Sequence, residues 1–238
     1  MSRPSALSDA TRSPGPASSG MNTSAPVVLD IWSDLVCPWC YIGRTRLEAA
    51  LRTPGASAPV IRWRAFELQP DLPPEGVEAR PFYARKFGGE ARVQQLFDQV
   101  AGVAAQDGLR LDFSKMRRAP NTRLGHRLVR LVDAGRPEAA DALVRALFVA
   151  HFTDGLDLSR AEVLLEVAAQ VEPALDLEAL RSGLLGDAAL DDVLADERLA
   201  GELGIRGVPF FVAGLQGPRP RAVSGAQAPE AFLRLLAA

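Results

Sequence analysis

The two cysteines of this chain stand three positions apart, in the segment Cys37-Pro38-Trp39-Cys40. A disulfide that closes so short a loop constrains the unfolded chain very little, so the pair is not a structural staple. Residues 27–32 are rich in β-branched and aromatic side chains, which predicts a strand. Apolar residues then recur at helical spacing over residues 37–51. We therefore expect the pair at the start of a helix that directly follows a strand.

This position gives each residue of the segment an expected role. A cysteine at the first position of a helix meets unpaired backbone N–H groups and the positive end of the helix dipole, which favour the thiolate. Cys37 is thus the expected nucleophile. Cys40, one turn further, can attack a mixed disulfide on Cys37 and release the partner. Pro38 suits the first turn, and Trp39 is expected to offer exposed apolar surface to a substrate.

A zinc site is the structural alternative, because a Cys-x-x-Cys segment also forms half of many zinc motifs. Two further ligands would be needed. The chain has no other cysteine, and its two histidines are His126 and His151. Their separation from Cys40 and from each other fits no compact zinc motif. We expect no metal site.

The order of the predicted elements indicates an α/β fold. After the first strand and helix come a strand at 60–66, a long helical block at 80–203 with a break around 118–120, strands at 208–212 and 222–224, and a helix at 229–236. A βαβ half is thus separated from a ββα half by a helical insertion. We expect a disordered leader (1–25), an α/β domain (26–79 with 204–238) and an all-helical insertion domain (80–203).

A second marker lies far downstream of the cysteines. Pro209 stands at the opening of a predicted strand, where a proline removes a hydrogen bond from the ladder. A cis Val208–Pro209 peptide that faces the cysteines would account for it, and a trans proline on an edge strand is the alternative. The presence of the cysteine pair favours the cis form.

Composition narrows the choice of partners and of compartment. A net charge of −2 and 24% charged residues give no electrostatic reason to expect nucleic acid. No apolar stretch approaches the roughly 20 residues of a membrane span. Residues 1–25 are rich in Ser, Ala, Pro and Gly without the apolar core of a signal peptide, and Met21 is an alternative start. We expect a cytoplasmic protein, a monomer or a homodimer.

Five segments, in order, carry a family resemblance: SDLVCPWCYIG (33–43), WRAFELQP (63–70), NTRLGHR (121–127), GVPFFV (207–212) and VSGAQ (223–227). Together they resemble the DsbA-like branch of the thioredoxin superfamily, especially its cytoplasmic FrnE-like members. The resemblance implies a thioredoxin-like fold with a large helical insertion. It also implies Cys37 as the attacking thiol, Cys40 as the resolving thiol and Pro209 as a cis-proline. The backbone of Val208 would then pair with an extended substrate peptide.

The same branch includes glutathione-dependent 2-hydroxychromene-2-carboxylate isomerases and kappa-class glutathione transferases. Those relatives typically carry serine at the position of Cys37. They also look to have Gly-x-Asp near the end of the sheet, where this chain reads Gly225-Ala226-Gln227. A dedicated glutathione site is therefore less expected, and no cofactor is predicted, while glutathione stays open as a reductant or co-substrate.

Several other side chains are weaker candidates. His126 is expected to be solvent-facing or packed, and the resemblance makes it a candidate substrate-binding residue beside a helix cap at Asn121. His151 is expected to be a packed helix residue. Glu67 is interpreted as an exposed carboxylate, with a proton acceptor near Cys40 as the alternative. A solvated basic face is expected from Lys115, Arg117, Arg118, Arg123, Arg127 and Arg130.

These patterns support three functions, in decreasing order of preference. The first is dithiol–disulfide exchange with protein, peptide or small-molecule substrates, in the reductase or isomerase direction because cytosolic thiols are kept reduced. The second is a glutathione-dependent isomerase or transferase that acts on an aromatic or polyketide-like metabolite. The third is a chaperone-like peptide binder with vestigial cysteines.

Overall fold

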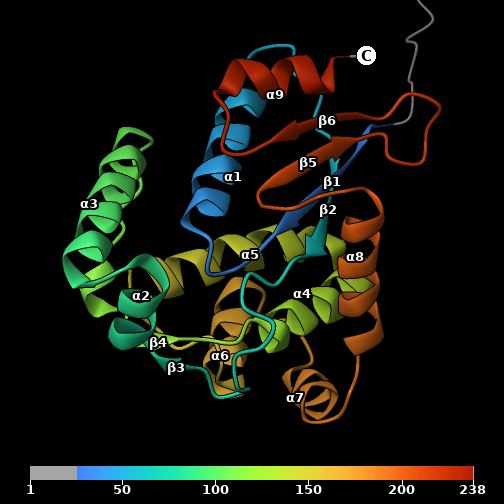
Figure 1. Ribbon diagram of the computed structural model, residues 1–238. Helices are drawn as coiled ribbons and strands as arrows, with labels where there is room; N and C mark the ends of the chain where they lie inside the picture. The colour runs from blue at the N-terminus through green and yellow to red at the C-terminus, as the bar shows by residue number, and fades with distance from the viewer. Residues whose placement is uncertain (1–25, 238) are drawn as a thin grey trace, which may run out of the picture.

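The computed structural model describes residues 26–237 (Figure 1). Its elements are β1 (Val28–Ser33), α1 (Pro38–Leu51), β2 (Val60–Ala65), β3 (Val77–Glu78), α2 (Ala79–Phe87), α3 (Glu90–Gln106), a 3-10 turn (Phe113–Lys115), β4 (Arg118–Ala119), α4 (Arg123–Gly135), α5 (Pro137–Phe152), α6 (Ala161–Val171), α7 (Leu177–Leu185), α8 (Leu190–Glu202), β5 (Phe210–Ala213), β6 (Arg221–Ser224) and α9 (Pro229–Leu236). The predicted disordered leader and the alternative start at Met21 lie outside these residues.

The main sheet has the strand order β2-β1-β5-β6. Strand β1 pairs in parallel with β2 and antiparallel with β5, and β5 pairs antiparallel with β6. A right-handed crossover through α1 is the ordinary way to join two parallel neighbours such as β1 and β2. The arrangement joins a βαβ half to a ββα half and confirms the predicted thioredoxin-like fold.

Alternate side chains of β1 supply the two faces of this sheet. Leu29 and Ile31 lie in the core that contains residues of α1 and α9, where Phe211 meets Phe232 edge to face at 4.7 Å between ring centroids. Trp32 points to the opposite face and belongs to a smaller cluster with residues of α8. Figure 1 shows α1 with α9 on one side of the strands and α8 on the other. Successive side chains of β1 thus point to opposite faces of the sheet, and each face packs against helices.

The helical block shares its core with the sheet. Leu47 of α1, Trp63 of β2, Leu128 of α4, Phe148 of α5 and Leu164 of α6 all belong to one buried cluster. Helix α8, which falls within the predicted insertion, packs directly against β2. The division into an α/β domain and an insertion domain at 80–203 stays a prediction.

One small sheet was not predicted. Strands β3 and β4 form an antiparallel pair of two residues each, and β4 lies where the sequence predicted only a break between helices. Two residues are too few to produce the alternation by which a strand is recognised. Gly76 is required beside this pair, because it has φ +68° and a Cβ there would lie 2.6 Å from the carbonyl oxygen of Ala119.

None of the helices within residues 26–237 combines the length and the apolar character that crossing a bilayer requires.

Candidate active site

Cys37 is the residue that caps the start of α1. Its φ of −95° and ψ of 109° are extended, and the helix begins at Pro38, as predicted. The carbonyl oxygen of Cys37 accepts hydrogen bonds from the backbone N–H groups of Cys40 and Tyr41 at 3.0 and 3.4 Å. No side chain caps these first N–H groups. The Cys37 sulfur therefore stands at the positive end of the helix dipole.

The predicted cis peptide is present between Val208 and Pro209. The carbonyl oxygen of Val208 accepts from the Cys37 thiol, with 3.7 Å between sulfur and oxygen. Pro209 is buried against α1 at Gly43, where a Cβ would lie 3.0 Å from its Cγ. The absence of a side chain at Gly43 is what allows α1 and the Val208–Pro209 loop to approach so closely.

Cys40 lies one turn below Cys37 and is 1% exposed. Burial raises the pKa of its thiol, and the neighbouring Cys37 raises it further, while Ser33 and the backbone of Asp34 lower it in part. Both cysteines are free thiols. Both cysteines are thus largely buried, Cys37 at 5% exposed and Cys40 at 1%, and the more deeply buried Cys40 holds its proton at neutral pH.

The remaining predicted residues of the segment lie at the surface around Cys37. Trp39 is 36% exposed and, as predicted, presents apolar surface. Pro38 occupies the first turn of α1 and is half-buried, as is Val208. The contact of these three residues with a substrate stays a prediction.

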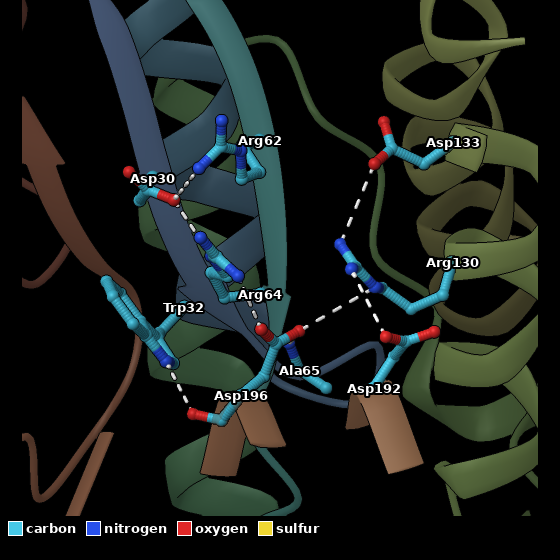
Figure 2. Close-up of polar contacts among 9 residues, drawn as sticks. All are labelled: Asp30, Trp32, Arg62, Arg64, Ala65, Arg130, Asp133, Asp192 and Asp196. Atoms are coloured by element: carbon cyan, nitrogen blue, oxygen red, sulfur yellow. Dashed lines mark hydrogen bonds and ion pairs between the residues drawn. The ribbon is translucent and has the colours of Figure 1, made fainter. Parts of the chain in front are cut away.

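A charge network holds α8 against the sheet (Figure 2). Asp196 of α8 is 2% exposed, and its carboxylate accepts from Nη1 of Arg64 at 2.8 Å and from the backbone N–H of Ala65 at 3.1 Å. Arg64 also donates to Asp30 at 2.8 Å, and the Asp196 carbonyl accepts from Nε1 of Trp32 at 3.1 Å. Burial would lower the pKa of Arg64, but the bonds to Asp196 and Asp30 raise it overall. Since the chain runs from α8 to Val208, this network helps to place the carbonyl that faces Cys37.

His126 is packed, which is one of its two predicted states. It is 6% exposed, and its Nε2 lies 3.4 Å from Oδ1 of Asp34. Asp34 is fully buried in the turn between β1 and Cys37. The structure thus places His126 beneath the turn that precedes the cysteines, and its predicted contact with substrate stays a prediction. The cap of α4 is Thr122 and not Asn121, although Oδ1 of Asn121 accepts from a backbone N–H at 3.0 Å.

The expectation that Glu67 is an exposed carboxylate is wrong. Its side chain is 1% exposed and pairs with Arg123, whose Nη2 lies 2.7 Å from Oε2. Burial raises the pKa of Glu67, and the opposite charge of Arg123 lowers it in part. The segment after β2 turns inward here because α4 and α8 cover it, which the local sequence does not reveal.

The expected solvated basic face is also wrong. Only Lys115 and Arg117 of its six members are exposed. Arg127 is buried and donates to the carbonyl groups of Gly183 and Ala188, both at 2.8 Å. The carbonyls of the last turn of α7 and of the segment after it lack helical partners, so a buried guanidinium satisfies them.

His151 is a packed helix residue, as predicted. It is 1% exposed, and its Nδ1 lies 3.5 Å from the carbonyl oxygen of Leu156. Burial lowers its pKa from 6.5 to about 4. Among residues 26–237, no three His, Cys, Asp or Glu side chains gather as a metal site.

Acid is expected to destabilise the protein through His151. The unfolded chain binds a proton on this residue below pH 6.5 and the folded chain only below about pH 4. The free energy of unfolding should therefore fall by up to ~3 kcal/mol as the pH drops through this window. His151→Gln cannot bind the proton and should lack this loss in urea unfolding at several pH values. Equal pH dependence in wild type and variant would contradict the assignment.

A hollow with an aromatic wall was not predicted from the sequence. It measures about 330 Å³ and lies between α2, α3 and the 3-10 turn. Its aromatic wall includes Phe97, which stacks on Phe113 at 4.2 Å and meets Tyr83 edge to face at 5.6 Å. Burial raises the pKa of Tyr83, and the negative charges of Asp34 and Cys37 add to the effect. The aromatic spacing along α2 and α3 was the available signal, but it indicates a packed core equally well.

Comparison with known proteins then decides the family. The family model described as a DSBA-like thioredoxin domain matches residues 28–237. The chain belongs to the DsbA-like thioredoxin family. A solved structure described as a probable DsbA oxidoreductase from Streptomyces coelicolor is similar to this DsbA-like protein, with 33% identity, 88% coverage of each chain and a TM-score of 0.77.

Two more distant solved structures share the fold of this DsbA-like protein. One is the cytosolic disulfide reductase DsbM from Pseudomonas aeruginosa with glutathione, at 23% identity, with 88% of this chain and 96% of that chain covered and a TM-score of 0.59. The other is a 2-hydroxychromene-2-carboxylate isomerase, at 19% identity, with 84% and 89% covered and a TM-score of 0.59. No curated protein sequence matches the chain significantly. The predicted membership of the DsbA-like branch is confirmed.

Proposed function

We propose that this protein catalyses thiol–disulfide exchange, with Cys37 as the attacking thiol and Cys40 as the resolving thiol. One observation carries the proposal. The Cys37 sulfur lies at the start of α1 and 3.7 Å from the Val208 carbonyl, while Cys40 is buried one turn below. An incoming disulfide therefore meets Cys37 first, and Cys40 can react only with the Cys37 sulfur once Cys37 has formed a mixed disulfide.

The reaction runs in two exchanges. The Cys37 thiolate attacks one sulfur of a substrate disulfide, which forms a mixed disulfide and releases the other sulfur as a thiolate. Cys40 loses its proton and attacks the Cys37 sulfur, so that the Cys37–Cys40 disulfide forms and the second substrate thiolate leaves. Two electrons pass from the cysteine pair to the substrate. A thiol reductant of the glutathione class returns the pair to the dithiol form.

The substrate is a disulfide in a protein, a peptide or a small molecule. An extended peptide would add as a strand beside Val208, whose carbonyl accepts from the Cys37 thiol, and Trp39 would contribute an exposed apolar surface. Strand addition recognises backbone and demands little of the side chains, which suits a range of disulfides. We place the protein in the cytoplasm, where reduced thiol pools favour the reductase or isomerase direction.

A glutathione-dependent isomerase or transferase is the second candidate. The hollow of about 330 Å³ between α2 and α3 favours it, because Tyr83, Phe97 and Phe113 provide an aromatic wall within reach of the Cys37 charge. Against it, Gln227 donates to the Ser224 carbonyl at 2.8 Å, at the position where glutathione-dependent relatives look to have an aspartate. A neutral amide binds the glutamyl amine of glutathione less well than a carboxylate does.

Redox equilibration and turnover distinguish the candidates. Wild type is equilibrated with dithiothreitol buffers of graded potential, the free thiols are alkylated, and the Cys37–Cys40 disulfide is quantified by mass. The proposal predicts a reversible two-electron transition and catalysed reduction of insulin disulfides. Saturable binding of glutathione with activity retained in Cys40→Ser would instead favour the isomerase or transferase. If no Cys37–Cys40 disulfide formed, the proposed exchange would be excluded and a peptide binder would remain.

A further inference from the structure

A cavity large enough for one water molecule lies at the end of β1, beside Ser33. Its volume is about 10 Å³, and its walls include Ser33 at the end of β1, Trp63 of β2, His126 and Arg130 of α4, and Val144 of α5. An ordered internal water needs about this much space and two to four polar partners. The cavity belongs to the seam where the sheet meets α4 and α5.

Three polar atoms at this cavity lack a hydrogen-bond partner within the described part of the chain. They are Oγ of Ser33, Nε2 of His126 and Nε of Arg130. The carboxylate oxygens nearest to Arg130 and His126 do not form hydrogen bonds with these nitrogens. Oδ2 of Asp196 lies 4.0 Å from the Arg130 nitrogen, and Oδ1 of Asp34 lies 3.4 Å from the His126 nitrogen without the alignment of a hydrogen bond. A water here would accept a hydrogen bond from Arg130 and form hydrogen bonds with both His126 and Ser33. All three polar atoms would then have a hydrogen-bond partner.

Ser33 connects this cavity to Cys40. Its hydroxyl is close enough to lower the pKa of the Cys40 thiol in part, although the two do not form a hydrogen bond of normal geometry. Burial and Cys37 raise that pKa more strongly. Cys40 is 1% exposed, so bulk water does not reach the sulfur to take its proton. The proton must therefore leave through a group inside the protein.

His126 continues the connection toward the surface. It lies beside Asp34 and close enough to Glu67 to interact with that carboxylate, which pairs with Arg123. The side chain of Arg123 is 36% exposed. The charged groups that face His126 are Asp34 from the turn after β1, Glu67 from the segment after β2, and Arg130 from its own helix. An imidazole between buried carboxylates and a water can accept a proton at one nitrogen and pass it outward.

We propose that this cavity holds a structural water and that His126, acting through this water and Ser33, accepts the Cys40 proton during resolution. This inference rests on the proposed thiol–disulfide exchange and names the route that the exchange requires. The Cys40 S–H bond breaks, its electron pair stays on sulfur and attacks the Cys37 sulfur, and the proton passes through water to the imidazole. The imidazolium then returns the proton to solvent or to the departing thiolate. His126 is a positioning and proton-transfer residue and does not touch the reacting sulfurs.

A single-turnover reaction with dithiobis(nitrobenzoate) separates the two steps. Cys37 attack releases one coloured thionitrobenzoate, and Cys40 attack releases the second. In His126→Gln the second release should be slower by at least about 10-fold near neutral pH, since a positioned proton acceptor is worth roughly 10²-fold or more. The deficit should shrink at high pH, because the thiolate form of Cys40 is then populated before resolution begins. The first release should stay unchanged, and Ser33→Ala, which removes a single oxygen, should slow the second release in the same direction.

His151→Gln is the matched control, because it replaces another buried histidine that does not line the cavity. Its second release should equal that of wild type. Equal second-release rates in wild type, Ser33→Ala and His126→Gln would overturn the inference, as would equal slowing in both histidine variants. If wild type itself released only one equivalent, the proposed function would fail before the role of His126 came into question.

Discussion

Replacing Cys37 with serine is expected to lower the turnover of disulfide substrates by at least about 10³-fold, because it removes the nucleophile of the first exchange and the sulfur attacked in the second. The hydroxyl that replaces the thiol is not ionised at neutral pH and cannot form a disulfide. Insulin reduction under steady-state conditions measures this loss. The Cys40 thiol cannot substitute for Cys37, since it is 1% exposed and burial raises its pKa.

The fold of Cys37→Ser should be preserved, so that the loss reports on chemistry. Cys37 is the capping residue of α1 and makes no side-chain cap bond, whereas serine is among the preferred capping residues. The free energy of unfolding should equal or slightly exceed that of wild type in urea. Turnover above about a tenth of the wild-type value in this folded variant would show that Cys37 is not the nucleophile.

Asp196→Ala is expected to lower the free energy of unfolding by about 3–5 kcal/mol, as found when one partner of a buried ion pair is removed. The change takes one of two carboxylate partners from Arg64 and leaves the backbone N–H of Ala65 buried without an acceptor (Figure 2). Urea unfolding measures the loss. Because α8 leads to Val208, we also expect slower attack by Cys37 in the folded variant.

Asp192→Ala is the matched control on the same helix. Its side chain is 59% exposed and lies 3.9 Å from Nη2 of Arg130, which is the geometry of a weak surface ion pair. Removing this side chain should lower the free energy of unfolding by less than about 1 kcal/mol. A loss in Asp196→Ala as small as that in Asp192→Ala would mean that the network does not hold α8 to the sheet.

The local structure around the cysteine pair was predictable because its determinants are local. The strand before Cys37, the helix from Pro38 and the proline at 209 each leave a signal in a few adjacent residues, and the structure has all three. The approach of Val208 to Cys37 was less local, since these residues are 171 positions apart. It was expected only because the sheet topology and the family resemblance brought the two segments together.

The surroundings of the centre were not predictable in the same way. Glu67 looks like a surface residue in sequence, and His126 was expected to be either solvent-facing or packed, yet both are buried. Arg127 carries the same charge as the exposed Arg117, yet it is buried because carbonyl groups at the end of α7 and after it require donors. Burial of a polar side chain depends on its distant partners, and no pattern within one helix reveals them.

The most direct test of the account is to trap the first intermediate. Cys40→Ser is incubated with a peptide disulfide, quenched with acid and mapped by mass spectrometry. The account predicts one peptide joined to Cys37 as a stable mixed disulfide, because the resolving thiol is gone, and no adduct in the Cys37→Ser variant treated in the same way. A Cys40→Ser protein that formed no adduct, or a Cys37→Ser protein that formed one as rapidly on Cys40, would contradict the account.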